Sequence, residues 1–273
     1  APDLITLDIE MPRMDGFTLL RIVMSRCPTP VIVISGRGLA GDVFRALELG
    51  AVDFIAKPVS HATPLLASIE SELLRKLHAV RALRLDALRS RLARSLSERT
   101  AVGPETGSGA PRVVALGAST GGPAALMEIF QAFEPAPPIA FLVAQHMPEG
   151  FTRDFAARVD RLTALSAREA AGGEEPAPGS VLVAPGGSHL EVEAVGGRVR
   201  TRVVRATAAD RFAPSVDRLF ESAAKAYGSD LLAVLSLNGS YHFSRGRKIA
   251  PFLTGGYSPI WGDGRAHMVN FGG

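Results

Sequence analysis

The sequence predicts an α/β fold of two domains, each built on a parallel sheet, followed by a tail of different composition. Short apolar runs alternate with amphipathic helix patterns, which is typical of strand–helix–strand units. A stretch rich in glycine, proline and serine, residues 102–111, separates two such series and indicates a flexible linker. After residue 237 the alternation ends, and glycines and aromatic residues become frequent.

Composition limits the class of protein. The 273 residues suffice for two domains, and 47% hydrophobic residues allow a large core. The net charge of +3 gives no argument for nucleic acid as a partner. A single cysteine, Cys27, excludes an intrachain disulfide and fits a reducing, cytoplasmic location. We find no leader and no apolar run of about 18 residues, so no membrane insertion is expected. The chain does not begin with methionine, so we expect its natural N-terminus to be missing.

The first series of elements spans residues 1–78. Strands are predicted at residues 4–7, 31–34 and 52–56, and helices at residues 17–25 and 40–49. Polar residues end the three strands, namely Asp8, Ser35 and Lys57. The carboxyl ends of parallel strands share one edge, so a carboxylate, a hydroxyl and an ammonium group would meet there. Such a set suits phosphoryl transfer to the aspartate with Mg²⁺ neutralising charge. Taken singly, the three also fit ordinary surface residues at loop starts.

Three segments make the prediction more specific: LDIEMPRMDG (residues 7–16), VISG (residues 33–36) and DFIAKP (residues 53–58). Together they closely resemble the receiver domain of two-component response regulators, a flavodoxin-like fold. The resemblance implies these roles: phosphoacceptor for Asp8, switch hydroxyl for Ser35, rotating aromatic for Phe54 and phosphoryl-binding lysine for Lys57. It also implies that Asp8 and the backbone of Glu10 ligate Mg²⁺. The acidic pair that holds this metal in receivers is absent from the sequence, so the receiver is expected to be partial.

A long amphipathic helix is predicted next, because apolar residues recur every three or four positions from Leu65 to Leu96. Its polar face is basic from Arg75 to Arg99, which admits nucleic acid as one interpretation. We favour a solvated helix face, because no aromatic residues interleave with the arginines. The linker is placed at residues 79–110.

The second domain is predicted over residues 111–237. Its expected strands are residues 113–116, 139–144, 181–184 and 231–235, with a hairpin at 190–204 and helices at 123–133, 150–160 and 215–227. Ser119 follows the first strand in a turn of small residues, and His146 follows the second strand. A right-handed crossover would put both strand ends on one edge of the sheet. We therefore predict a nucleophile and general base for acyl transfer, with N–H groups of the glycine turn binding an oxyanion.

Other interpretations of these residues stay open at this point. A histidine at a strand end is more often structural than catalytic. The glycine-rich turn could instead bind a phosphate or a dinucleotide. It lacks the G-x-G-x-x-G order and the P-loop lysine that such sites use.

Four segments in order again sharpen the prediction: GASTGGP (residues 117–123), AQHMPEGFT (144–152), VAPGGSHL (183–190) and FAPSVDRLF (212–220). With the preceding receiver, they resemble the chemotaxis protein-glutamate methylesterase (CheB) family over residues 1 to about 235. The resemblance implies a doubly wound methylesterase domain with Ser119 as nucleophile, His146 as general base and Thr120 in support.

The resemblance also implies an activity and partners. The reaction would be hydrolysis of glutamate methyl esters on methylated chemoreceptors, with glutamine deamidation as a second activity and no cofactor for the esterase. A chemotaxis histidine kinase would be the phosphodonor, and phosphorylation would move the receiver off the active-site face. The rival interpretation is a catalytically impaired, receiver-linked regulatory or receptor-binding module.

The resemblance ends after the last predicted strand. The family continues with Thr-Gly-Met-Gly, a variable position and Asp-Gly, and that aspartate is the third member of the triad. Residues 236–247 read SLNGSYHFSRGR instead. Asp263 could replace the acid only if the tail, residues 238–273, folds back. We therefore expect an incomplete triad and an unassigned tail.

Overall fold

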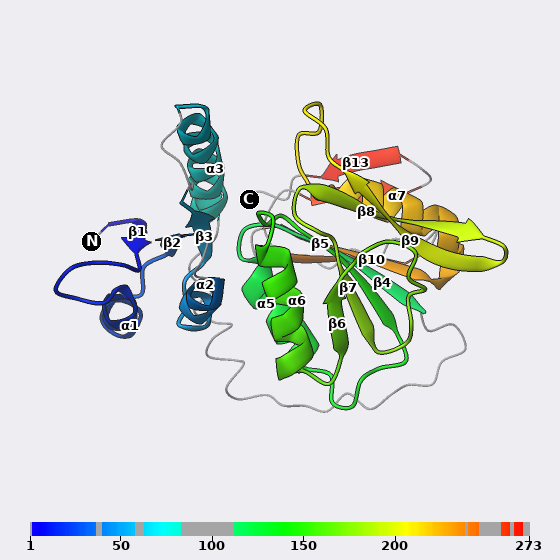
Figure 1. Ribbon diagram of the computed structural model, residues 1–273, viewed down its shortest axis with the longest axis horizontal. Helices are drawn as coiled ribbons and strands as arrows, with labels where there is room; N and C mark the ends of the chain where they lie inside the picture. The colour runs from blue at the N-terminus through cyan, green and yellow to red at the C-terminus, as the bar shows by residue number, and fades with distance from the viewer. Residues whose placement is uncertain are drawn as a thin grey trace.

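The computed structural model describes residues 2–36, 40–57, 63–82, 112–237, 240–245, 258–262 and 265–269. Figure 1 shows two α/β units, the first in blue to cyan and the second from green onwards. Within these ranges, no helix has both the length and the apolarity needed to cross a membrane.

The first unit is a three-stranded parallel sheet with helices around it. Its elements are β1 (Ile5–Asp8), α1 (Gly16–Arg26), β2 (Val31–Ser35), α2 (Ala40–Glu48), β3 (Asp53–Ala56) and α3 (Thr63–Ala82). The strand order is β1-β2-β3, so β2 lies in the middle, and its residues Val31, Ile32 and Val33 are almost fully buried. The side chain of Asp15 caps α1 by accepting from the N–H of Phe17. All five predicted elements are confirmed with ends shifted by at most one residue, and α3 confirms the start of the long helix. Its predicted continuation lies outside the described residues.

The second unit is a six-stranded sheet with a separate two-stranded ribbon. Its elements are β4 (Val113–Ala118), α5 (Gly122–Gln131), β5 (Ala140–Gln145), α6 (Phe151–Leu162), β6 (Ser166–Glu169), β7 (Ser180–Val183), β8 (Ser188–Val195), β9 (Arg198–Arg205), α7 (Val216–Tyr227), η1 (Gly228–Asp230), β10 (Leu231–Leu237) and β11 (Ser240–Arg245). The sheet order is β11-β10-β4-β5-β7-β6, parallel except for β11. The ribbon is the predicted hairpin β8-β9.

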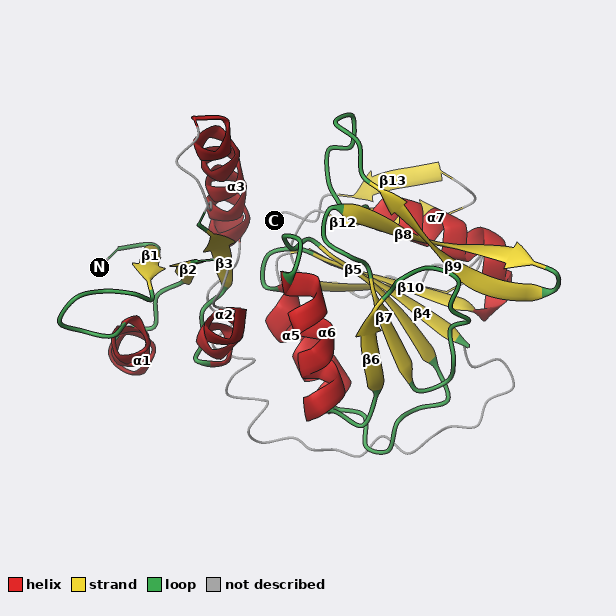
Figure 2. Cartoon of the chain, viewed as in Figure 1, coloured by secondary structure: helices red, strands yellow, loops and turns green. Residues whose placement is uncertain are grey.

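Both faces of this sheet are covered, as Figure 2 shows. Val114 and Leu116 of β4 belong to the core formed with residues of α5 and α6. Val113 and Ala115, which alternate with them, belong to the opposite core with residues of β8 and α7. The doubly wound arrangement therefore follows from an apolar strand that is buried on both sides.

Four described strands differ from the sequence expectation or extend it. The strand β6 was not predicted, because Ala167 is its one buried apolar residue and the segment has no apolar run. In the tail, β11 extends the sheet by pairing antiparallel with β10. The strands β12 (Ser258–Gly262) and β13 (Arg265–Val269) form a separate antiparallel pair.

The two units share one apolar core. Phe44 of α2 lies 6.0 Å from Phe155 of α6, and Phe54 of β3 lies 4.8 Å from Phe151, measured between ring centroids. Glu48 forms an ion pair with Arg158 at the edge of this contact. The first unit is thus packed against the helix that follows His146.

Candidate active site

In the turn after β4, the backbone lies very close to the side chain of Gln145. Ser119 follows the strand directly, Gly121 has φ of +75°, and α5 begins at Gly122. The N–H of Gly122 donates to the carbonyl of Ser119 over 2.8 Å. A Cβ on Gly122 would lie 1.9 Å from Oε1 of Gln145, so only glycine fits there. The turn therefore holds Ser119 directly before the N-terminus of α5.

The nucleophile and base candidates lie in hydrogen-bond contact. Ala118 pairs with Gln145 in the β4–β5 register, so Ser119 and His146 follow at the same edge of the sheet. Nδ1 of His146 is 3.1 Å from Oγ of Ser119. The structure thus brings together the two residues that the sequence predicted as a pair.

Gln145 forms hydrogen bonds to the backbones of both Ser119 and His146, and the sequence analysis did not identify it as a site residue. Its side-chain amide is buried and donates to the carbonyl of Ser119 over 2.9 Å and to the carbonyl of His146 over 3.2 Å. The one available signal was an amide residue at the end of an otherwise apolar strand. Thr120 is also buried, and its hydroxyl has no hydrogen-bond partner within the described ranges.

The imidazole of His146 is covered by a segment far away in the sequence. The ring of Phe212 stacks on it with centroids 5.0 Å apart and planes inclined by 20°. The backbone carbonyl of Pro214 lies close enough to the ring to act on its pKa. Burial, followed by the charges of Arg75 and Lys76, lowers the pKa of His146 to about 4, against the opposing effect of the Pro214 carbonyl. The ring is therefore neutral at neutral pH and can accept a proton.

Arg75 corrects one expectation. The sequence placed it on a solvated helix face, but Nη1 donates to Oγ of Ser119 over 3.1 Å. The neighbouring Lys76 is buried, forms an ion pair with Asp53 over 2.8 Å and donates to the carbonyl of Phe54 over 2.5 Å. The reason is tertiary packing, since Lys76 fixes α3 against β3 and turns Arg75 towards the second unit. The other arginines of that predicted face lie outside the described residues.

At the edge of the first sheet, the structure brings together most of the predicted groups. Nζ of Lys57 lies 2.6 Å from Oδ2 of Asp8, and the N–H of Glu10 donates to Oδ1 over 3.0 Å. The hydroxyl of Ser35 instead donates to the carbonyl of Gly36 over 3.5 Å. Phe54 is buried between Phe151 and the ammonium group of Lys76.

These groups do not by themselves fit a magnesium site. Both carboxylate oxygens of Asp8 already accept hydrogen bonds, one from Lys57 and one from Glu10. The part of the chain that the structure describes contains no group of three or more side chains able to hold a metal. Mg²⁺ prefers several oxygen ligands in octahedral geometry, which one paired carboxylate does not supply.

Among the described residues, no carboxylate contacts His146, and the incomplete triad stays a prediction. Asp263, the substitute considered from the sequence, lies outside them.

Comparison with known proteins adds to this geometry. The family described as "CheB methylesterase" matches residues 114–240, and the "Response regulator receiver domain" matches residues 1–70. Protein-glutamate methylesterase/protein-glutamine glutaminase 3 of Geobacter sulfurreducens is 47% identical over 86% of this chain and 68% of its own length. Enzyme 1 of that name from Myxococcus xanthus is 41% identical over 99% of this chain and 76% of its own length. The methylesterase catalytic domain of CheB from Thermotoga maritima has 37% identity and a TM-score of 0.44 over 46% of this chain and 67% of that chain. The chain therefore belongs to the family of receiver-linked protein-glutamate methylesterases/protein-glutamine glutaminases.

Proposed function

We propose that this chain hydrolyses glutamate methyl esters on chemoreceptors and that its receiver controls access to the nucleophile. The observation that carries the proposal is the 3.1 Å contact between Oγ of Ser119 and Nδ1 of His146, in a turn that admits only glycine at its helix start. The names of the relatives supply the substrate class.

The geometry supports a two-step acyl transfer. Oγ of Ser119 attacks the ester carbonyl while His146 takes the hydroxyl proton, and backbone N–H groups of the glycine-rich turn before α5 would stabilise the oxyanion. The imidazolium then protonates the departing methoxide, and methanol leaves. Water, deprotonated by His146, attacks the acyl-enzyme and releases the glutamate carboxylate with Ser119 restored. A glutamine side chain would follow the same steps and release ammonia.

The closed arrangement supports the regulatory part of the proposal. Arg75 donates a hydrogen bond to Oγ of Ser119, and the next residue, Lys76, donates to the backbone carbonyl of Phe54. Phosphorylation of Asp8 by a chemotaxis histidine kinase would be sensed at Phe54 and would withdraw Arg75. The proposal keeps the division into receiver (1–78), linker (79–110), catalytic domain (111–237) and tail (238–273), and a cytoplasmic location.

The test is methanol release from methylated chemoreceptor membranes. We expect Ser119→Ala to lower the rate by about 10³-fold or more, because the nucleophile is lost. Ser166→Ala is the matched control, because Ser166 is an exposed serine at the start of β6 in the same domain. Equal release from the Ser119→Ala protein would exclude the mechanism.

A second candidate function rests on the lack of a carboxylate at His146 in the described part. A receptor-binding module without catalysis would bind methylated membranes yet resist a fluorophosphonate probe. Labelling of the wild type but not of Ser119→Ala would exclude this candidate, since the probe reacts only with an activated serine.

A further inference from the structure

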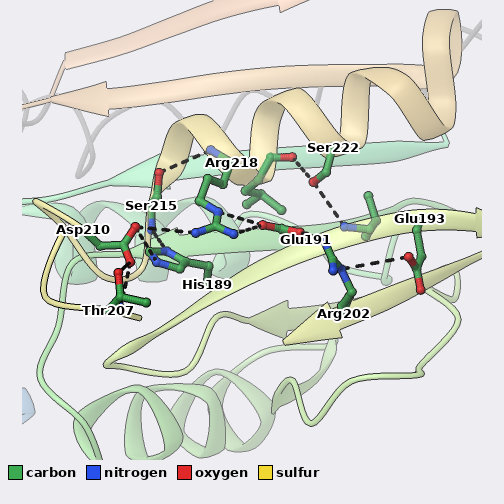
Figure 3. A network of polar contacts seen from close by, with 11 residues as sticks. His189, Glu191, Glu193, Arg202, Thr207, Asp210, Ser215, Arg218 and Ser222 are labelled. Carbon is green, nitrogen blue, oxygen red and sulfur yellow. Dashed lines mark hydrogen bonds and ion pairs between the residues drawn. The ribbon is translucent and has the colours of Figure 1, made fainter. Parts of the chain in front are cut away.

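A buried histidine that the proposed reaction does not use anchors the loop over His146. His189, in β8, is fully buried. Its Nδ1 accepts the N–H of Ser215 over 3.0 Å, and its Nε2 lies 3.3 Å from Oδ1 of Asp210 (Figure 3). The second contact is electrostatic, since Nε2 has no partner in hydrogen-bond geometry among the described residues. Both contacts are to the segment 206–215, which joins β9 to α7.

The partners of His189 are themselves fixed. The N–H and the hydroxyl of Thr207 each donate to Oδ2 of Asp210 over 2.8 Å, and they lower the pKa of Asp210 to about 2. Nη1 of Arg218 lies 3.5 Å from Oδ1 of the same carboxylate. Ser215 caps α7, because its hydroxyl accepts the N–H of Arg218 over 3.3 Å. The loop is therefore tied to β8 and to α7 on both sides of residues 211–214.

Residues 211–214 carry both contacts from this loop to the catalytic imidazole. Phe212 stacks on the ring, and the backbone carbonyl of Pro214 lies close enough to the ring to raise its pKa. Nδ1 of His146 faces Ser119, which leaves Nε2 as the nitrogen available to donate to the Pro214 carbonyl. A hydrogen bond at one ring nitrogen fixes which nitrogen carries the proton, a task that a carboxylate performs in a complete triad.

We propose that His189 is a positioning residue: with Asp210 it holds loop 206–215 so that Phe212 and the Pro214 carbonyl orient His146 in place of a triad carboxylate. The inference rests on the proposed function only in naming His146 as the base. A carbonyl fixes the tautomer but carries no full charge, so it stabilises the imidazolium less than a carboxylate does.

The tautomer can be measured without any substrate. In ¹H–¹⁵N spectra of the imidazole rings in the full chain, we expect His146 to be the Nε2–H tautomer in the wild type. His189→Ala should give a mixture with the Nδ1–H form and should slow fluorophosphonate labelling of Ser119 by roughly tenfold, the effect of about 1.4 kcal/mol. His189→Asn should restore part of both readouts, because its Oδ1 can accept the N–H of Ser215.

Two further variants keep the test decisive. If His189→Ala fails to fold, Asp210→Ala removes the other half of the pair from a partly exposed position and should shift the tautomer in the same direction. Glu193→Gln is the matched control, because Glu193 lies at the rim of the same network and contacts Arg202 rather than the loop. An unchanged Nε2–H tautomer in folded His189→Ala and Asp210→Ala proteins would overturn the inference. Absence of labelling in every variant, the wild type included, would count against the proposed function, while the tautomer would still decide the role of His189.

Discussion

The hydroxyl of Ser119, in the second unit, is in contact with the guanidinium group of Arg75 from α3 of the first unit. Arg75 donates to Oγ over 3.1 Å, and an ester carbonyl that approaches Oγ would have to displace this contact. We expect Arg75→Gln to raise the basal rate of fluorophosphonate labelling about tenfold, since a hydrogen bond to a charged group contributes about 1.5–3 kcal/mol. His78→Ala, on the exposed side of α3, is the control and should leave the rate unchanged. A rate for Arg75→Gln at or below that of the wild type would show that Arg75 does not obstruct the site.

The protonation of His146 gives a prediction with a definite sign. The pKa is lowered to about 4, first by burial and then by Arg75 and Lys76, so the neutral base is lost only as the pH falls through about 4. Removal of the Arg75 charge takes away one of the lowering causes. We therefore expect Arg75→Gln to move the NMR titration midpoint of His146 upwards, towards the ordinary value of about 6.5. A midpoint that stays or moves down would mean that Arg75 is not close to the ring in solution.

The sequence predicted the nucleophile and the base of this site, but not the residues that surround them. Ser119 and His146 could be predicted because each follows an apolar strand, and parallel strands align their ends. Arg75, Phe212 and Pro214 reach the site from two other segments of the chain. Phe212 and Pro214 stand in the segment FAPSVDRLF, which contributed to the family resemblance, but nothing in the sequence assigned either of them or Arg75 a contact with Ser119 or His146. Such contacts exist only after the segments have packed.

At the start of α5, the structure leaves no room for a side chain on Gly122. A Cβ at Gly122 would lie 1.9 Å from Oε1 of Gln145 and 2.8 Å from Cβ of Ala118. We expect Gly122→Ala to displace Gln145 and to lower the free energy of unfolding by about 1–3 kcal/mol, as overpacking does. Gly41→Ala in α2 is the matched control: a Cβ there meets nothing within 4 Å, and alanine favours a helix by about 0.5–1 kcal/mol.

Thermal and denaturant unfolding would measure both variants. Equal stability of Gly122→Ala and the wild type would mean that the turn can relax and that Gln145 does not hold it.

How apolar a strand is decides whether the sequence could predict it. The strands β4 and β5 were found because they are apolar throughout, whereas β6 buries only alternate side chains at the edge of the sheet.

In the whole molecule, the contact between the units combines apolar packing with the ion pair between Glu48 and Arg158. Phe44 and Phe54 meet Phe155 and Phe151, and these rings share a core with residues of both sheets. The order of the two domains was predictable from their motifs. Their mutual packing was not, because the buried phenylalanines are also what each domain needs for its own core.

The ion pair between Glu48 and Arg158 offers a way to open this contact without touching the site. Arg158 is mostly buried and Glu48 half exposed, so Glu48→Arg places two like charges together at a partly desolvated edge. We expect faster labelling of Ser119, by about threefold to tenfold, and a larger radius of gyration by small-angle scattering, since like charges so placed cost about 1 kcal/mol or more. The swapped pair Glu48→Arg with Arg158→Glu should restore the wild-type values, because the attraction is re-formed in reverse.

Asp3→Arg is the control: it also replaces a carboxylate by a guanidinium, but at an exposed position of the first unit, and it should have no effect. If the swapped pair labels as fast as Glu48→Arg alone, the increase comes from damage to α2 rather than from separation of the units, and the control of Ser119 by receiver packing would need another basis.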